Sequence, residues 1–82
     1  MAKFTKKQGR YLAFIHLYRK LHRQEPAELD ITKYFRFSPP SVQQMVAKLD
    51  ALALITREPG VARSIRVAIS ARELPDLEDE GD

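Results

Sequence analysis

Short polar side chains gather on one face of a helix predicted in the middle of the chain. From residue 38 onward, apolar residues recur at helical spacing, which places serine, glutamine and alanine on the opposite face. Glutamine can form a bidentate hydrogen-bond pair with the N6 and N7 atoms of adenine, and small alanines permit close approach. A helix face that only contacts solvent would have the same composition, so contact with DNA bases and simple exposure to water both stay open here. The candidate contact residues of this segment are Ser38, Ser41, Gln43, Gln44 and Lys48.

Three arginines follow this helix around a turn signal. Arg57, Arg63 and Arg66 flank the Glu-Pro-Gly sequence at residues 58–60. A protruding loop rimmed by arginines suits contact with phosphates or with a narrow minor groove. The alternative is an exposed hairpin that uses charge to avoid aggregation. Because the charges are nearly all of one sign, we favour a nucleic-acid-contacting role for the three arginines.

The charge of the chain is divided unevenly along its length. Residues 1–70 carry 13 Lys and Arg against 5 Asp and Glu, a net charge of +8. Residues 71–82 carry 1 Arg against 6 Asp and Glu, a net charge of −5. A basic body attracts a polyanion, and an acidic end can solubilise the chain or compete with that ligand. We therefore expect a folded basic domain over residues 1–70 and an acidic C-terminal tail over residues 71–82.

The sequence contains no signal for catalysis or for a metal. It has no cysteine, and neither His16 nor His22 has a second ligand at metal-binding spacing. No glycine-rich phosphate loop or nucleophile motif occurs, so we expect no enzyme activity and no cofactor. No apolar run approaches the roughly 20 residues that span a bilayer, and the N-terminus does not read as a signal peptide. We expect no membrane partner and a cytoplasmic location.

The helices that must position these residues are predicted from periodicity and capping signals. A capping-box pattern at residues 5–8 opens a helix over Lys6–His22. Pro26 separates it from a shorter helix over about residues 27–35. Ser38 followed by proline is typical of an N-cap and first helical position, and we expect a third helix over residues 38–53. On the first helix we expect inward-facing Tyr11, Phe14, Ile15, Tyr18 and Leu21, and outward-facing Gly9, Ala13, His16 and Lys20.

Two short alternating segments complete the predicted fold. Residues 54–57 and 63–69 have the pattern of strands on either side of the turn, which indicates a β-hairpin. The order of helix, helix, tight turn, helix and hairpin predicts an α+β fold that is mainly α. We interpret it as a three-helix winged helix-turn-helix with a C-terminal β-hairpin wing.

Residues 5–67 resemble the N-terminal DNA-binding domain of the LexA repressor family. Thr-Lys-Lys-Gln at residues 5–8 is similar to the opening T-x-R-Q of that domain, and Pro26 matches a proline before its second helix. Residues 63–67, Arg-Ser-Ile-Arg-Val, are similar to its S-R-G-I-R-L wing. Further similar segments are Phe14-Ile15, Asp30-Ile31 and Phe37-Ser38-Pro39.

This resemblance implies a repressor-like transcriptional regulator that binds double-stranded DNA sequence-specifically, with the third helix in the major groove and the wing on the backbone. Ala27 departs from the family's usual threonine cap, and Arg36 replaces part of its Leu-Gly turn. The family's second domain supplies a self-cleaving Ser/Lys pair and a dimer interface. These 82 residues contain neither, so we expect no self-cleavage, and a homodimer would need another route or a partner protein. The residues implied to face base edges are Ser38, Pro40, Ser41 and Gln44.

A protein-interaction adaptor is the alternative function, because winged helices also serve as adaptors and a fold does not fix a function. In that case the Gln/Ala face, or the exposed part of the first helix, would dock another protein. The arginines of the wing would then serve solubility. DNA binding requires the excess positive charge to lie beside the third helix and the wing, which distinguishes the two functions.

Overall fold

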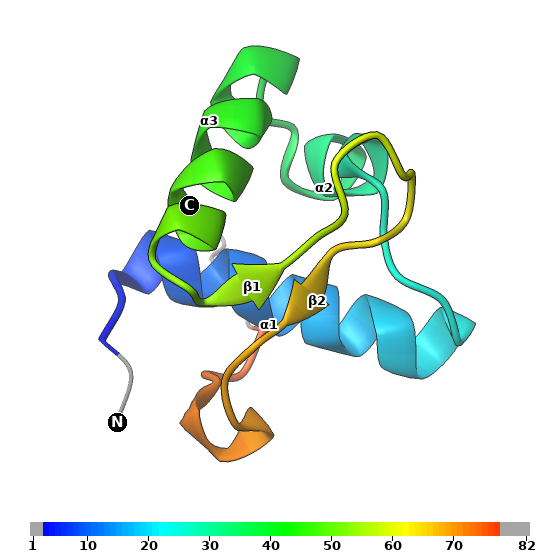
Figure 1. The fold of residues 1–82 in the computed structure, drawn as a ribbon. Helices are drawn as coiled ribbons and strands as arrows, with labels where there is room; N and C mark the ends of the chain where they lie inside the picture. The colour runs from blue at the N-terminus through cyan, green and yellow to red at the C-terminus, as the bar shows by residue number, and fades with distance from the viewer. Residues whose placement is uncertain (1–2, 78–82) are drawn as a thin grey trace.

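Three helices followed by a two-stranded antiparallel hairpin make up the computed structural model, which describes residues 3–77 (Figure 1). The hairpin lies across α1, and the loop between its strands reaches toward α2 (Figure 1). This architecture confirms the predicted mainly helical winged-helix fold. The elements in chain order are α1 Lys6–His22, α2 Glu28–Phe35, α3 Pro39–Ala51, β1 Ile55–Thr56, β2 Arg66–Val67 and the 3₁₀ turn η1 Ala71–Glu73.

Helix α1 begins at the capping box that the sequence predicted. The Gln8 N–H donates to Thr5 Oγ1 at 3.1 Å, and the Thr5 N–H donates to Gln8 Oε1 at 2.9 Å. These two bonds satisfy amide groups that have no partner inside the helix. The helix ends at His22, and the following residue, Arg23, adopts the left-handed conformation with φ 57°. Both predicted bounds of α1 are confirmed.

Local hydrogen bonds stabilise both ends of α2, although its N-cap lacks a side-chain oxygen and its tight connection to α3 contains no glycine. Ala27, at the N-cap of α2, has no side-chain oxygen, and the Asp30 carboxylate instead accepts its N–H at 2.8 Å. At the other end, Arg36 adopts the left-handed conformation with φ 59°, and its N–H donates to the Thr32 carbonyl at 2.8 Å. Both departures from the LexA pattern are therefore accommodated by local hydrogen bonds.

Helix α3 and the hairpin are shorter than the sequence predicted. The Ser41 N–H donates to Ser38 Oγ, which confirms the predicted cap, but the helix ends at Ala51 because Ala53 turns to φ 60°. The strands pair Ile55 with Val67 and Thr56 with Arg66. Beyond this ladder the Ala68 N–H still donates to the Leu54 carbonyl at 2.9 Å.

One hydrophobic core joins all five main elements. It holds α1 against the inner faces of α2 and α3, and the hairpin closes it from the side. Phe35 and Phe37 pack against it, with ring centroids 5.4 Å and 5.9 Å from that of Tyr11. The buried core residues are Tyr11, Leu12, Phe14, Ile15, Ile31, Val42, Val46, Leu49, Leu54, Ile55 and Ile65.

The predicted facing of α1 is wrong at three positions. Gly9 and Ala13 were expected to face outward but are buried, whereas Leu21 was expected in the core and is 74% exposed. A Cβ atom on Gly9 would lie 2.9 Å from a Phe4 ring carbon and 3.1 Å from the Pro75 ring. The chain after β2 thus covers a second side of α1, which the helical period alone does not reveal.

The residues after η1 also contact the core. Leu74 and Leu77 are partly buried against it. Residues 78–82, which include four of the acids of the predicted tail, lie outside the described residues. The expected division of the chain at residue 70 stays a prediction.

Candidate nucleic-acid interface

The outer face of α3 is exposed and rich in hydrogen-bonding groups. Val42, Val46 and Leu49 are fully buried on the inner side of the helix, as the apolar period predicted. The opposite side therefore has to face solvent. Its exposed residues are Pro40, Ser41, Gln43, Gln44, Ala47, Lys48 and Ala51.

Two serines at the start of α3 have different hydrogen-bonding states. Ser38 Oγ accepts the Ser41 N–H at 3.3 Å and donates to Ser41 Oγ at 2.9 Å. The Ser38 hydroxyl is therefore used in both directions to cap the helix. Ser41 Oγ accepts that bond and still has its own proton to donate to a ligand. Of the two predicted contact residues, Ser41 is the better placed to offer a donor.

A groove separates α3 from the N-terminal turn of α1, with a volume of about 490 Å³. Lys7 and Lys48 line its two sides, and no carboxylate belongs to the residues of 3–77 that line it. Lys7 Nζ also lies 4.7 Å from the centroid of the Phe37 ring. The lining residues are Thr5, Lys7, Gln8, Ser41, Gln44, Met45 and Lys48.

Lys7 was not among the predicted site residues. The sequence did carry a signal for it, because Lys3, Lys6 and Lys7 stand at the start of α1, where cations oppose the helix dipole. The structure brings Lys7 and Lys48 to one groove across about 40 residues of sequence. Positive charge therefore lies directly beside the outer face of α3.

Arg57 lies between two helices. Its Nε is 3.1 Å from Asp50 Oδ2 on α3, and its Nη1 is 3.6 Å from Glu28 Oε2 on α2. The guanidinium side chain is only 29% exposed. This predicted contact residue therefore ties the first strand of the wing to α2 and α3.

Arg63 makes the longest-range contacts of the wing. Its Nη1 donates to Tyr18 Oη at 3.1 Å, to Asp30 Oδ2 at 3.0 Å and to the Glu25 carbonyl at 3.3 Å. The hydrogen bond to Tyr18, followed by the charge of Asp30, raises the pKa of the Arg63 guanidinium above its ordinary value. Arg63 therefore fastens the loop of the wing to α1 and α2.

Arg66 is held at the same place by a carboxylate. Its Nε donates to Glu25 Oε2, which also accepts from Arg19 Nε at 3.0 Å. The hydrogen bond from Arg19, with a further contribution from Arg66, lowers the pKa of Glu25. Two guanidinium groups therefore share one carboxylate oxygen.

The acids of the basic body are concentrated on the wing side of the molecule. Within the described residues, Glu25, Glu28, Asp30 and Asp50 all form ion pairs with arginines. Their charges offset those of the three wing arginines. The predicted contact residues therefore fall into two groups. Those on the outer face of α3 lie beside groove lysines that have no carboxylate near them among the lining residues of 3–77. Those in the wing are arginines that already form ion pairs.

Residues 3–77 contain no cluster of three or more His, Cys, Asp or Glu side chains that could hold a metal ion. Nor does any helix within them have the length and apolar character to cross a membrane.

Comparison with known proteins supports the resemblance seen in the sequence. No protein-family model matches the chain. The LexA repressor of Thermosipho melanesiensis is 37% identical over 65 residues, which are 79% of this chain and 33% of that protein. The chain thus spans about a third of the length of the curated relative it matches. The similarity of this chain to the LexA repressor, which its motifs indicated, is therefore confirmed.

Proposed function

We propose that the chain binds double-stranded DNA sequence-specifically, as a repressor-like transcriptional regulator, with α3 in the major groove. The exposed Ser/Gln/Ala face of α3 is the observation that carries this proposal. A helix enters the major groove only where its outer side chains are short enough and polar enough to reach base edges. The LexA repressor to which the chain is similar is named for repression, which supports the same function.

Base reading is assigned to the first two turns of α3. Gln44 and Gln43 carry amides that match the hydrogen-bonding edge of adenine, and Ser41 can donate from its hydroxyl. Pro40 offers an apolar contact beside them, and the small Ala47 and Ala51 leave room for the DNA behind them. Ser38 contributes by holding the start of the helix in place.

Phosphate contacts are assigned to the groove and to the wing. Lys48 of α3 and Lys7 of α1 line the same groove, where the backbone of a duplex seated on α3 would pass. Arg57, Arg63 and Arg66 are the wing residues proposed to lie along the backbone. Such contacts release counterions, so binding by one copy should be modest in affinity and strongly dependent on salt.

The test is an in-vitro selection of bound duplexes from a randomised pool, performed at near-physiological salt. We expect enrichment of one short motif, because the side chains of α3 present a fixed set of donors and acceptors. A motif with two-fold symmetry would indicate that two copies bind together. Absence of any enriched motif, even at low salt, would overturn sequence-specific binding.

A protein-interaction adaptor is the second candidate function, and exposed apolar side chains favour it. Leu29 and Tyr34 on α2 are 58% and 52% exposed, and Leu21 at the end of α1 is 74% exposed. Under this alternative, the duplex selection with the wild type yields no enriched motif. A Leu29→Ser variant would then lose the concentration-dependent association that we expect of the wild type in sedimentation experiments. Under the DNA-binding proposal, the same variant should select the same motif as the wild type.

A further inference from the structure

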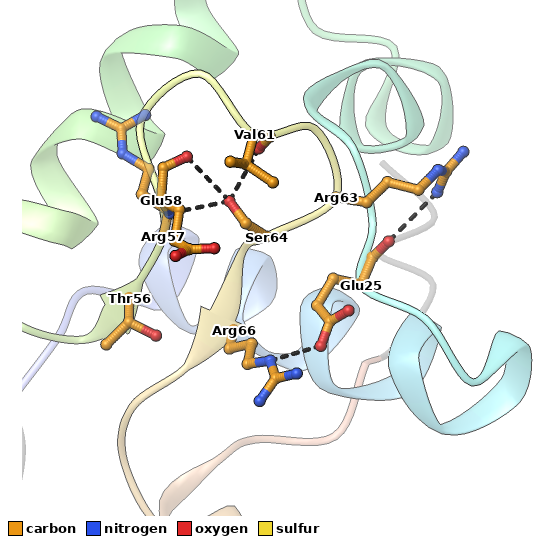
Figure 2. A pocket seen from close by; sticks show the side chains of 8 residues that line it. All are labelled: Glu25, Thr56, Arg57, Glu58, Val61, Arg63, Ser64 and Arg66. Atoms are coloured by element: carbon orange, nitrogen blue, oxygen red, sulfur yellow. Dashed lines mark hydrogen bonds and ion pairs between the residues drawn. The ribbon is translucent and has the colours of Figure 1, made fainter.

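We propose that the Glu25 carboxylate competes intramolecularly with DNA phosphates for Arg66 of the wing and for the neighbouring Arg19 of α1, and so limits how strongly this part of the chain binds duplexes of any sequence. This inference rests on the proposed DNA-binding function. It assigns a role to Glu25, a residue of the α1–α2 connection that the predicted contact set does not include. Figure 2 shows its side chain and backbone facing Arg66 and Arg63.

The geometry places one acid at the meeting point of three basic side chains. Glu25 Oε2 accepts from Nε of both Arg19 and Arg66, and the Glu25 carbonyl accepts from Arg63 Nη1 at 3.3 Å. The Glu25 side chain is only 14% exposed, whereas those of Arg19 and Arg66 are 54% and 59% exposed. The carboxylate is therefore covered by the guanidinium groups, which themselves remain open to solvent.

Carboxylates and phosphodiesters compete for the same donors. Each is an oxyanion that accepts short, charge-assisted hydrogen bonds from a guanidinium group. A phosphate that approaches Arg66 must displace the Glu25 oxygen or share the arginine with it, and in both cases it meets the negative charge of Glu25. The occupied Nε–H of Arg66 is thus withheld from DNA, and the charge of its guanidinium is offset.

Arg63 is engaged more fully than Arg66. Tyr18 and Asp30 hold the same Nη1 group that contacts the Glu25 carbonyl. Loss of the Glu25 carboxylate leaves these contacts in place, so the wing stays fastened to α1 and α2 through Arg63. Arg66 and Arg19 are the two groups that a change at Glu25 releases.

Glu58 provides a matched control within the same wing. It lies at the turn and, among the described residues, its carboxylate forms no ion pair; only its backbone contacts Ser64. Glu25→Gln and Glu58→Gln each raise the net charge of the chain by one. Only the first also releases arginine donors.

The experiment measures the affinity of the wild type and both variants for a selected duplex and a scrambled duplex over a range of salt concentrations. For Glu25→Gln we expect roughly five- to tenfold tighter binding to both duplexes, the size of about one screened charge interaction. The log–log salt slope should steepen by about 0.9 because one more phosphate is neutralised. For Glu58→Gln we expect less than about a twofold change, since that charge is exposed and screened.

A readout without DNA tests the contact itself. Hydrogen exchange of the Arg66 Nε–H, followed by NMR, should accelerate in Glu25→Gln and stay unchanged in Glu58→Gln. Should Glu25→Gln fail to fold by circular dichroism, Glu25→Asp keeps the charge but shortens its reach, and it should accelerate the same exchange and tighten binding less. Equal responses of the Glu25 and Glu58 variants overturn the inference alone. Failure of the wild type to bind any duplex overturns the proposed function, and the inference with it.

Discussion

The outer face of α3 and the wing are both polar surfaces, but they differ in what their side chains already contact. The outer-face residues of α3 after the Ser38 cap are exposed to solvent, and the neighbouring groove adds Lys7 and Lys48, with no carboxylate among the described residues that line it. In the wing, each of the three arginines has an acidic or carbonyl partner on another element. A charged residue is therefore informative about ligand binding only once its intramolecular partners are known.

The largest effect expected on this comparison is at Gln44. Gln44→Ala should relax the base preference at one position by about 1–3 kcal/mol of discrimination, because a bidentate contact is lost. Its stability should stay close to that of the wild type, because the side chain is exposed. The measurement is a repeat of the duplex selection, with Gln24→Ala as an exposed glutamine away from α3. An unchanged motif in Gln44→Ala would show that α3 does not read the bases.

Two arginines share a left-handed backbone conformation, but within residues 3–77 only one of them forms side-chain hydrogen bonds to other elements. Arg36 and Arg63 have φ 59° and 57°, a region that glycine adopts at little cost. Arg36→Gly should raise the free energy of unfolding by about 0.5–1 kcal/mol, as the left-handed strain is removed.

Arg63→Gly should fall short of that gain, because it also loses the bonds to Tyr18, Asp30 and Glu25. Thermal and urea unfolding of both variants give the comparison directly. A gain in Arg63→Gly as large as that in Arg36→Gly would mean that the contacts of the wing contribute nothing to stability. Removal of the Arg63 guanidinium, a proposed phosphate contact, should also weaken binding of Arg63→Gly to selected and scrambled duplexes alike.

A smaller effect is expected at the groove. Lys7→Ala should make the log–log salt dependence of DNA binding shallower by about 0.9, the value for one lost phosphate contact. Lys20→Ala is the control, because Lys20 is an exposed lysine of α1 that does not line the groove. Equal slopes for the two variants would place the bound backbone elsewhere.

The smallest effect is the acid dependence of the contact at Glu25. Its pKa is lowered in the folded state, chiefly by the hydrogen bond from Arg19. The folded state therefore holds the proton less tightly than the unfolded state, so the stabilisation is present above pH about 4.3, the ordinary value of a glutamate. It is lost as the pH falls through the lowered pKa.

Melting temperatures between acidic and neutral pH test this dependence. The difference in melting temperature between the wild type and Glu25→Gln should shrink as the solution is acidified. A difference that stays constant over that range would show that the ion pairs at Glu25 do not stabilise the fold.

Local signals in the sequence were sufficient to locate the three helices and the N-caps of two of them. The Thr5 and Ser38 caps, the bounds of α1 and the outward face of α3 all depend on residues three or four positions apart. Interactions at such short separation are determined by helix geometry alone. The left-handed turns at Arg36 and Ala53 were exceptions, because glycine is the usual signal for such turns.

Contacts between distant segments could not be predicted in this way. Gly9 is buried because Phe4 and the distant Pro75 both pack over it, and Leu21 is exposed because no element of residues 3–77 covers the end of α1. Arg63 meets Tyr18 and Asp30 across 45 and 33 residues. The periodicity of apolar residues predicts that a side chain packs against other apolar groups, but it does not identify the segment to which those groups belong.

The sequence by itself determined the order of the elements, the inner and outer faces of α3 and the excess of basic residues in the body. Only the tertiary structure decided which of those basic residues are left without an acidic partner in the described chain and so are available to a ligand. It placed the acids Glu25 and Asp30 against the wing and left Lys7 and Lys48 together beside α3. The physical reason is that helix periodicity acts over a few residues, whereas ion pairs depend on distances in space that the packed core alone fixes.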